Sequence, residues 1–242
     1  MKILYALQAT GNGHIARAEE LLPYLQKKAE IDVLLSGNNY SLSPSFEYKY
    51  SKKGISLLYK PCGKLDFLKT YKELNPIKIL RELNSLNLEK YDLIINDFEP
   101  LTSHLAKKYH KPILQIGHQA SFQSKKTPRP DKKSVLGELI LKKYATGDKY
   151  LGFHFEKYDE GILYPIIKKE ILDASPINNG HITIYLPSVD IHCMYNALKK
   201  FAYQEFHVFT NQVDKVISCN NIKYYPVSNM EFTKSMIEAH GI

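Results

Sequence analysis

Short apolar runs alternate along this chain with longer segments in which apolar residues recur every three or four positions. The alternation predicts a parallel sheet covered by helices, because parallel strands are buried on both faces and are joined by helical crossovers. The chain is therefore expected to belong to the α/β class. The strands predicted in the first series span residues 2–7, 31–35, 55–59, 93–96, 113–116 and 150–155.

The same periodicity predicts the helices between these strands. One apolar helical face follows the first strand and runs from Ile15 to Leu25. Pro23 predicts a kink or a short break in that helix, because proline lacks a backbone donor. Further helices are expected over residues 65–88, with an interruption near Asn75, and over residues 101–109.

A second, smaller series of elements begins near residue 180. The segment before it, YPIIKKEILDASPINNG, contains prolines, asparagines and a glycine, which favours a hinge. We therefore predict two domains, residues 1–163 and residues 164–242. The elements of the second series are strands over 181–186, 205–209 and 222–225 and helices over 191–202 and 231–239.

Length and composition exclude several classes of protein. No apolar run approaches the roughly 20 residues of a membrane-spanning helix, and the N-terminus lacks the apolar stretch of a secretory signal, so a cytoplasmic protein is expected. Cys62, Cys193 and Cys219 form no C-x-x-C pair and predict neither a disulfide framework nor a zinc site. The net charge of +8 favours an acidic partner, which leaves a phosphorylated substrate, an anionic membrane surface or nucleic acid.

Polar residues follow several of the predicted strands. In an open parallel sheet, ligands bind in the crevice beyond the carboxyl ends of the strands. These residues are therefore expected to share one rim of the sheet. The candidate substrate-binding residues are Gly11, Asn12, Gly13, Asn38, Glu99, His118, Gln119 and Ser188.

The stretch ATGNGHIARA, residues 9–18, is the first of these strand ends. Its glycines let the main chain approach a ligand closely, and the helix that follows points free N–H groups and a positive dipole end at the rim. The stretch is neither the dinucleotide fingerprint G-x-G-x-x-G nor a Walker loop. The alternative is a plain strand-to-helix turn that needs glycine.

His14 is a candidate general base, because imidazole titrates near neutrality and accepts a proton from a hydroxyl nucleophile. Asp97, at the end of a later strand, is a candidate partner for the second ring nitrogen and would stabilise the imidazolium. Two structural roles remain as alternatives. In these, His14 only hydrogen-bonds the loop, and Asp97 caps the helix that begins near Pro100.

The segment SKKTPRPDKKS, residues 124–134, has five basic residues and no aliphatic or aromatic side chain except its prolines, and is expected to be an exposed loop. It is either a peripheral contact with anionic lipid or a solvated loop. The aromatic residues follow no RNP-like pattern, so nucleic acid is not an expected partner. The histidines follow no metal-ligand spacing, so neither a metal nor another cofactor is expected.

Three segments together carry a family resemblance. YALQATGNGHIARA, DLIINDFEPL and PILQIGHQ, in this order, resemble the N-terminal half of glycosyltransferases of the GT-B fold. The nearest subgroup is related to the N-acetylglucosaminyltransferase of peptidoglycan synthesis. The loop here reads T-G-N-G-H and lacks the double glycine of that enzyme, so the identity of its acceptor does not carry over.

The resemblance implies an N-terminal Rossmann-like domain that binds the acceptor and a second Rossmann-like domain that binds the donor. It implies metal-independent transfer of a sugar from a nucleotide sugar, expected to be a UDP-sugar, to a hydroxyl acceptor in cell-envelope or polysaccharide synthesis. Gly11, Gly13 and His14 match the family's glycine-rich loop, and Asp97 lies at a compatible strand end.

The last segment, FTKSMIEAHGI, resembles the part of the family that precedes the strand and glycine-rich helix start that hold the donor phosphates. The second domain is therefore expected to be incomplete in this chain, which would be inactive alone. Two other functions stay open. One is a nucleotide-sugar epimerase of the same fold, and the other is a non-catalytic module that binds a sugar phosphate or anionic lipid.

Overall fold

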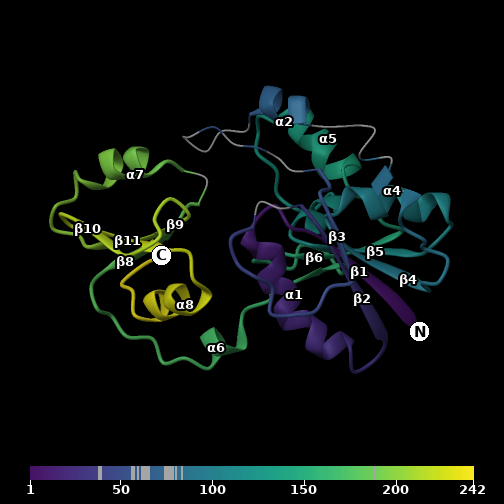
Figure 1. The fold of residues 1–242 in the computed structure, drawn as a ribbon, viewed down its shortest axis with the longest axis horizontal. Coiled ribbons are helices and arrows are strands. Elements are labelled where there is room, and N and C mark those ends of the chain that lie inside the picture. Colours follow the sequence, from purple (N-terminus) through teal and green to yellow (C-terminus); the bar gives the residue numbers. More distant parts are fainter. Residues whose placement is uncertain are drawn as a thin grey trace. The chain divides into compact units, whose positions relative to one another are not determined.

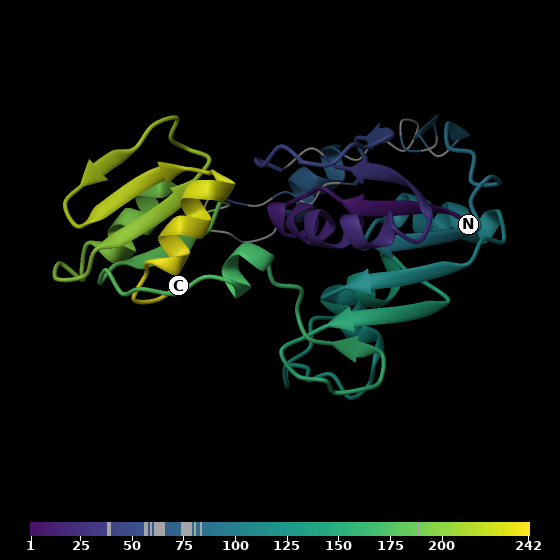
Figure 2. The ribbon, with the colours of Figure 1, turned by 90° about the horizontal axis from the view of Figure 1, so that it is seen from below.

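The computed structural model describes residues 1–37, 40–55, 58, 60, 66–73, 79, 81–82, 84–187 and 189–242. The chain forms two compact units (Figures 1 and 2). The domain boundary expected after residue 163 stays a prediction. The first unit comprises Met1–Ser56 and Leu74–Ile167, and the second comprises Leu57–Glu73 and Lys168–Ile242.

The first unit is built on a seven-stranded sheet in which each pair of neighbouring strands is parallel. The strand order is β3-β2-β1-β4-β5-β6-β7. Because the strands are parallel, their carboxyl ends lie along one edge. The strands are β1 (Lys2–Gln8), β2 (Glu30–Ser36), β3 (Tyr50–Lys52), β4 (Leu93–Asp97), β5 (Ile113–Gly117), β6 (Lys149–Phe153) and β7 (Ile162–Leu163).

Separate apolar clusters lie on the two faces of this sheet, because side chains alternate along each strand. Tyr5 and Leu7 share a buried cluster with Ile15 of α1 (Asn12–Leu25). Residues of the opposite parity, Leu4 and Ala6, share a second cluster with Leu105 of α4 (Pro100–Lys108). Helices therefore cover both faces, as Figure 1 shows, and α1 lies on the face to which Tyr5 and Leu7 point.

Pro23 lies inside α1, which continues through it to Leu25. The expected short break does not form there. Pro23 sits in the last turn of the helix, so its missing N–H removes a hydrogen bond only near the helix end.

The second unit contains a four-stranded sheet with the order β10-β11-β9-β8. Its strands pair in parallel except for the β10–β11 hairpin, whose turn places Asn220 at a φ of +53°. Phe206, Val208 and Ile222 form its apolar core with Met194. The elements are β8 (Ile182–Tyr185), β9 (Phe206–Thr210), β10 (Ile217–Cys219), β11 (Ile222–Pro226), α2 (Phe67–Glu73), α6 (Lys169–Leu172), α7 (Ile191–Leu198) and α8 (Asn229–Ile237).

Apart from the segment 55–59, the strands predicted from short apolar runs are confirmed with small shifts at their ends, and the predicted helices after β1, β4, β8 and β11 are also present. The strand expected over residues 55–59 is wrong where it is described, because Ile55 and Leu58 lie outside any strand. The third strand forms earlier, at Tyr50–Lys52. Residues 56, 57 and 59 and much of the helix expected over 65–88 lie outside the described residues.

Two helical elements of the first unit were not predicted, the 3-10 helix η1 (Gln119–Gln123) and α5 (Val135–Lys143). Both follow β5, one on each side of the segment 124–134. No helix in the described part of the chain combines the length and apolarity that crossing a bilayer requires.

Candidate active site

The candidate site begins where β1 leads into α1. The backbone N–H of Ala9 donates to the carbonyl of Ser36 at 2.6 Å, which holds the ends of β1 and β2 together. Gly37 has a φ of +113°, and a Cβ on it would lie 2.8 Å from the Ala9 carbonyl oxygen. Only glycine therefore fits at this point beneath the loop.

Gly11 and Gly13 differ from Gly37. Gly11 has extended backbone with a φ of 173°, and neither residue lies in the left-handed region that favours glycine. A Cβ on either would meet nothing within 4 Å in the described part of the chain. The turn itself does not require glycine at these positions, and the missing side chains leave space beside the backbone for another molecule.

No side chain in the described part of the chain caps the start of α1. Gly11 occupies the N-cap position and makes no side-chain cap, and the first turn contains no acidic residue. The first N–H groups of a helix have no partner within the helix, and its dipole makes this end favourable for an anion. The start of α1 therefore has the backbone geometry of an anion site.

Asn12 is buried and connects this helix start to the loop after β2. Its side-chain oxygen accepts hydrogen bonds from the N–H groups of Ser41 at 3.0 Å and Leu42 at 3.2 Å, and its side-chain nitrogen donates to Ser41 Oγ at 2.8 Å. These bonds give Asn12 a positioning role in the loop. Two other candidate residues, Asn38 and Ser188, lie outside the described residues.

His14 and Asp97 come together at the sheet edge. His14 Nδ1 lies 2.9 Å from Asp97 Oδ1. The contact follows from the fold, because Asp97 has the same strand parity as Ile95 and points to the face that α1 covers. The Asp97 side chain is 0% exposed, whereas that of His14 is 14% exposed. A buried carboxylate thus holds a partly accessible imidazole.

Arg17 is the third member of this group, and we did not predict it. Its Nε lies 3.3 Å from Asp97 Oδ2, an ion pair without the alignment of a hydrogen bond. Its guanidinium also lies over the Phe153 ring at 5.7 Å. His14 and Arg17 are three residues apart on α1, so they share one helix face. That spacing is the signal that sequence reasoning missed.

Gly117, at the end of β5, makes room for the same carboxylate. Its φ is +112°, and a Cβ on it would lie 2.7 Å from Asp97 Oδ1 and 3.0 Å from Arg17 Nη1. Any larger residue would therefore strain the backbone and displace the Asp97 carboxylate. Gly117 thus contributes to the geometry of the pair, although it was not among the candidate catalytic or substrate-binding residues.

The pKa of Tyr5 reflects the charges of Asp97 and Arg17. Its side chain is fully buried, and burial raises the pKa of its hydroxyl well above the usual value. The negative charge of Asp97 raises this pKa further, and the positive charge of Arg17 lowers it. The charges of Asp97 and Arg17 therefore affect a group in the solvent-excluded core, where charges interact more strongly than in water.

Glu99 caps α4. Its two carboxylate oxygens accept hydrogen bonds from the N–H groups of Leu101 at 3.0 Å and Thr102 at 2.6 Å, and Thr102 Oγ1 also donates to it at 2.6 Å. Because Glu99 is the N-cap, the alternative that Asp97 caps this helix is wrong. The substrate-binding role that we expected for Glu99 stays a prediction, and its carboxylate has a complete structural function.

His118 and Gln119 lie at the start of η1, after β5. His118 Nδ1 lies 3.1 Å from the carbonyl oxygen of Phe153, and its ring stands edge-on to Phe122 at 5.2 Å. Gln119 Oε1 is buried and has no hydrogen-bond partner in the described part of the chain. In the described part of the chain, neither residue hydrogen-bonds to His14 or Asp97, and their expected contact with substrate stays a prediction.

The described residues contain no group of three or more His, Cys, Asp or Glu side chains that could hold a metal ion. The polar groups that the structure brings together here are His14, Asp97 and Arg17, with the backbone at the start of α1. Such a group can move a proton at the imidazole and bind an anion at the helix start.

Comparisons with known proteins extend these observations. The model of a family described as glycosyl transferase family 1 matches residues 1–242. A comparison with curated protein sequences finds no match. Among solved structures, the chain is similar to S. aureus MnaA in a co-structure with UDP, with a TM-score of 0.58, 11% identity, and coverage of 99% of this chain and 73% of that one.

Two further structures are similar over nearly the whole chain. A UDP-N-acetylglucosamine 2-epimerase matches with a TM-score of 0.50 and 12% identity, over 99% of this chain and 73% of that one. MurG from Acinetobacter baumannii matches with a TM-score of 0.45 and 14% identity, over 99% and 71%. The similarities to MnaA and to the 2-epimerase show the fold. It is GT-B-like, with a Rossmann-like parallel-sheet unit followed by a smaller one.

Proposed function

Because the chain belongs to glycosyl transferase family 1, we propose that it transfers a sugar from a nucleotide sugar to a hydroxyl acceptor, with His14 as the general base. The contact that carries this proposal is the 2.9 Å approach of His14 Nδ1 to Asp97 Oδ1. It joins the start of α1 to the end of β4, 83 residues away in the chain.

The contact defines which ring nitrogen is available for chemistry. A carboxylate only accepts hydrogen bonds, so Nδ1 of His14 carries the proton that points to Asp97. Nε2 then has a free lone pair, and it has no hydrogen-bond partner among the described residues. In the proposed step, Nε2 takes the proton of the acceptor hydroxyl, and Asp97 stabilises the imidazolium that forms.

The remaining bond changes are those of glycosyl transfer. The deprotonated acceptor oxygen forms a bond to the anomeric carbon of the sugar, and the bond from that carbon to the diphosphate oxygen breaks. Negative charge then grows on the leaving diphosphate. The uncapped N–H groups at the start of α1, beside Gly11 and Gly13, are suited to stabilise this charge.

We propose UDP as the nucleotide of the donor, a choice supported by the fold shared with the UDP co-structure of MnaA. The step needs no metal ligand, as the family resemblance implies. The same resemblance supports an acceptor in cell-envelope or polysaccharide synthesis.

Product analysis of the full-length protein tests this proposal. The protein is incubated with UDP-sugars, with and without a panel of hydroxyl acceptors, and the products are identified by mass spectrometry. Acceptor-dependent release of UDP and a glycosylated product are expected. If an epimerised UDP-sugar forms without acceptor, the protein is an epimerase and the proposal of sugar transfer fails. If calorimetry detects no binding of UDP, a non-catalytic binding module is favoured instead.

A further inference from the structure

The α5 helix exposes an apolar face. Val135, Leu136 and Leu139 are 86%, 44% and 55% exposed, and no residue of α5 is buried. At about 100° per residue, these three positions fall within roughly 100° of the helix circumference. They therefore form one stripe, which we call the α5 stripe. Contiguous apolar side chains on a surface mark an interaction site more often than isolated ones do.

Contacts away from the stripe hold α5 in place. Ser134 caps the helix by accepting a hydrogen bond from the N–H of Gly137 at 3.2 Å. Gln123 of η1 donates to the carbonyl oxygen of Leu141 at 3.1 Å. Glu138 forms an ion pair with Arg129 at 3.2 Å. The stripe is therefore presented by an anchored helix.

The preceding basic segment is only partly the exposed loop that the sequence predicted. Thr127 is buried and donates its hydroxyl proton to the carbonyl oxygen of Ser121 at 2.6 Å. Arg129 packs over the Phe122 ring at 4.5 Å. These contacts fix the middle of the segment, whereas Lys132 and Lys133, directly before α5, are exposed.

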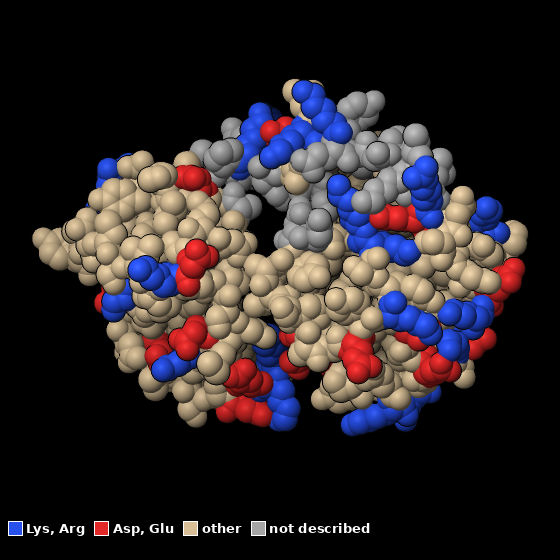
Figure 3. Space-filling model, in the orientation of Figure 1, with Lys and Arg blue, Asp and Glu red and all other residues tan. Residues whose placement is uncertain are grey.

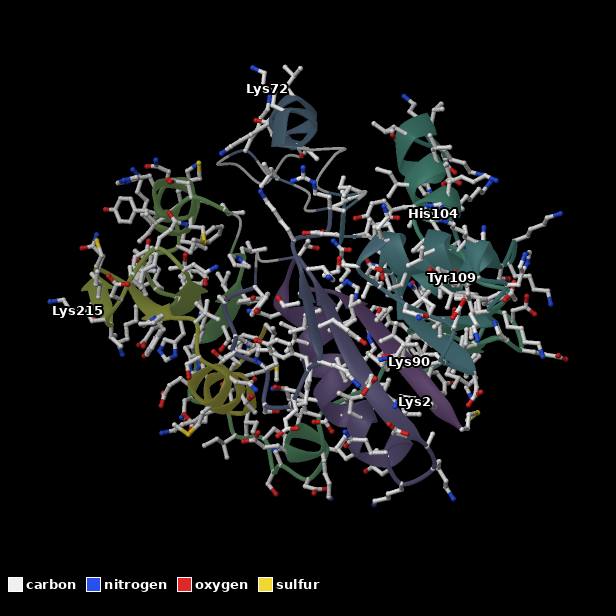
Figure 4. All side chains as sticks on the ribbon, turned by 45° about the vertical axis from the view of Figure 1, so that its right-hand side comes forward. Lys2, Lys72, Lys90, His104, Tyr109 and Lys215 are labelled. Atoms are coloured by element: carbon white, nitrogen blue, oxygen red, sulfur yellow. The ribbon has the colours of Figure 1, made fainter. Side chains whose placement is uncertain are left out.

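Lysines border the α5 stripe at both ends. Lys132 and Lys133 precede it, and Lys142 and Lys143 end the helix and are also exposed. Lys143 follows Leu139 by four residues and so shares its helix face. Figure 4 shows side chains projecting outward from α5. Figure 3 shows basic and acidic side chains next to one another at several places on the face drawn there.

We propose that the α5 stripe and its bordering lysines dock the protein on a bilayer surface that contains anionic lipid. Aliphatic side chains that enter the headgroup region, surrounded by lysines that attract lipid phosphates, are the features of an interfacial helix. Nucleic acid is a poorer match, because single strands are bound by aromatic stacking, and the stripe is aliphatic. The inference is independent of the proposed sugar transfer.

Vesicle co-sedimentation of the full-length protein tests the docking. Vesicles of phosphatidylcholine alone are compared with vesicles in which part of it is replaced by phosphatidylglycerol. Binding is expected only to the mixed vesicles, and added salt should weaken it because salt screens the lysines. Equal binding to both kinds of vesicle, or to neither, would overturn the proposal.

Matched substitutions locate the surface. Leu139→Asp should lower the partition coefficient more than about tenfold, because a leucine side chain that would enter the bilayer is replaced by a charge. Leu172→Asp on α6, where Leu172 is 65% exposed, is the control and should change little. Lys132→Gln with Lys133→Gln should lower binding about 25-fold, at about fivefold for each lysine near the surface. The control for net charge is Lys199→Gln with Lys200→Gln.

Circular dichroism establishes that each variant is folded. Val135→Asp, at the first and most exposed residue of α5, replaces Leu139→Asp if that variant is unfolded. If the folded apolar variant binds mixed vesicles as well as the unchanged protein does, the α5 stripe is not the docking surface and the proposal fails.

Discussion

Two histidine–carboxylate pairs of nearly equal length lie in the two units of the chain. His14 Nδ1 is 2.9 Å from Asp97 Oδ1 in the first unit, and His207 Nε2 is 2.8 Å from Glu205 Oε1 in the second. Distance alone does not distinguish them. Their surroundings do, and the difference separates a candidate base from a structural histidine.

The second pair is saturated with contacts. His207 Nδ1 lies 3.2 Å from Ser235 Oγ, so both of its ring nitrogens have partners. Its ring stacks on His181 at 3.8 Å, and Glu205 is shared with Lys223 at 2.7 Å. This histidine joins β9 to α8 and has no nitrogen left for a substrate.

The first pair has the opposite arrangement. The Asp97 carboxylate is wholly buried between His14 and Arg17, and the remaining nitrogen of His14 has no partner in the described residues. A general base needs an oriented ring with one free nitrogen. The comparison therefore predicts that the first pair governs activity and the second governs stability.

The largest expected effect is that of Asp97→Asn. Turnover of UDP-sugar by the full-length protein should fall by at least about 100-fold, because the imidazolium loses its charged partner and the tautomer of His14 is no longer fixed. Steady-state release of UDP measures the effect. Glu205→Gln, the matched change in the second unit, should leave turnover within about twofold. An equal loss of turnover in both variants would contradict the assignment of catalysis to the His14–Asp97 pair.

Gly117→Ala should lower the free energy of unfolding by about 2 kcal/mol, because alanine is strained at a φ of +112° and its Cβ would displace the Asp97 carboxylate. Chemical denaturation measures the change. Turnover of the folded variant should also fall, since the pair is displaced. A variant as stable and as active as the unchanged protein would contradict the close approach of Gly117 to Asp97.

His207 of the second pair should make the stability of the folded chain depend on pH. Burial lowers the pKa of His207, and the neighbouring His181 lowers it further, although the hydrogen bond to Glu205 raises it. The unfolded chain, with a pKa near 6.5, therefore takes up this proton at a higher pH than the folded one does. Neutral His207 therefore stabilises the folded chain above about pH 6.5. This contribution should be lost as the pH falls through the lower pKa that His207 has in the folded chain.

Thermal melts between pH 7.5 and pH 5.5, an interval of about one pH unit on each side of the usual histidine pKa, measure this loss. His207→Gln should flatten the dependence of stability on pH, because it removes the group whose pKa is lower in the folded chain. An unchanged pH dependence in the His207→Gln variant would assign the loss of stability to other groups. Among the charged neighbours, Lys223 is the one whose positive charge also lowers this pKa.

The smallest expected effect on stability is that of Gly13→Ala. Stability should rise by about 0.5 kcal/mol, because alanine favours the helix and the added methyl group meets nothing within 4 Å in the described chain. Affinity for UDP, measured by calorimetry, should nevertheless fall about tenfold if the ligand occupies that space. A variant with unchanged UDP affinity would place the diphosphate elsewhere.

Much of the sheet was predictable from local sequence. The apolar runs that became β1, β2, β4 and β5 are unambiguous, because strands buried on both faces need them. The carboxyl ends of these strands also predict that His14 and Asp97 lie on one rim of the sheet. β3 and β10 were not predicted, since short edge strands carry polar residues and lack this signal.

The supporting residues of the site were harder to predict. Arg17 lies in a helix and not at a strand end, and only its spacing from His14 indicates a shared face. Gly117 is defined by a positive φ and by the approach of Asp97 across the sheet. Glu99 precedes Pro100, a residue favoured in the first turn of a helix, and this pattern was the available signal for its capping role.

The most direct test compares His14→Gln with His207→Gln in the full-length protein, using the rate of UDP release in the presence of acceptor. Both substitutions keep a polar side chain and remove the imidazole. The account predicts a loss of at least about 100-fold for His14→Gln and a near-normal rate for His207→Gln. A His14→Gln variant that keeps most of its activity would contradict the proposal that His14 is the base.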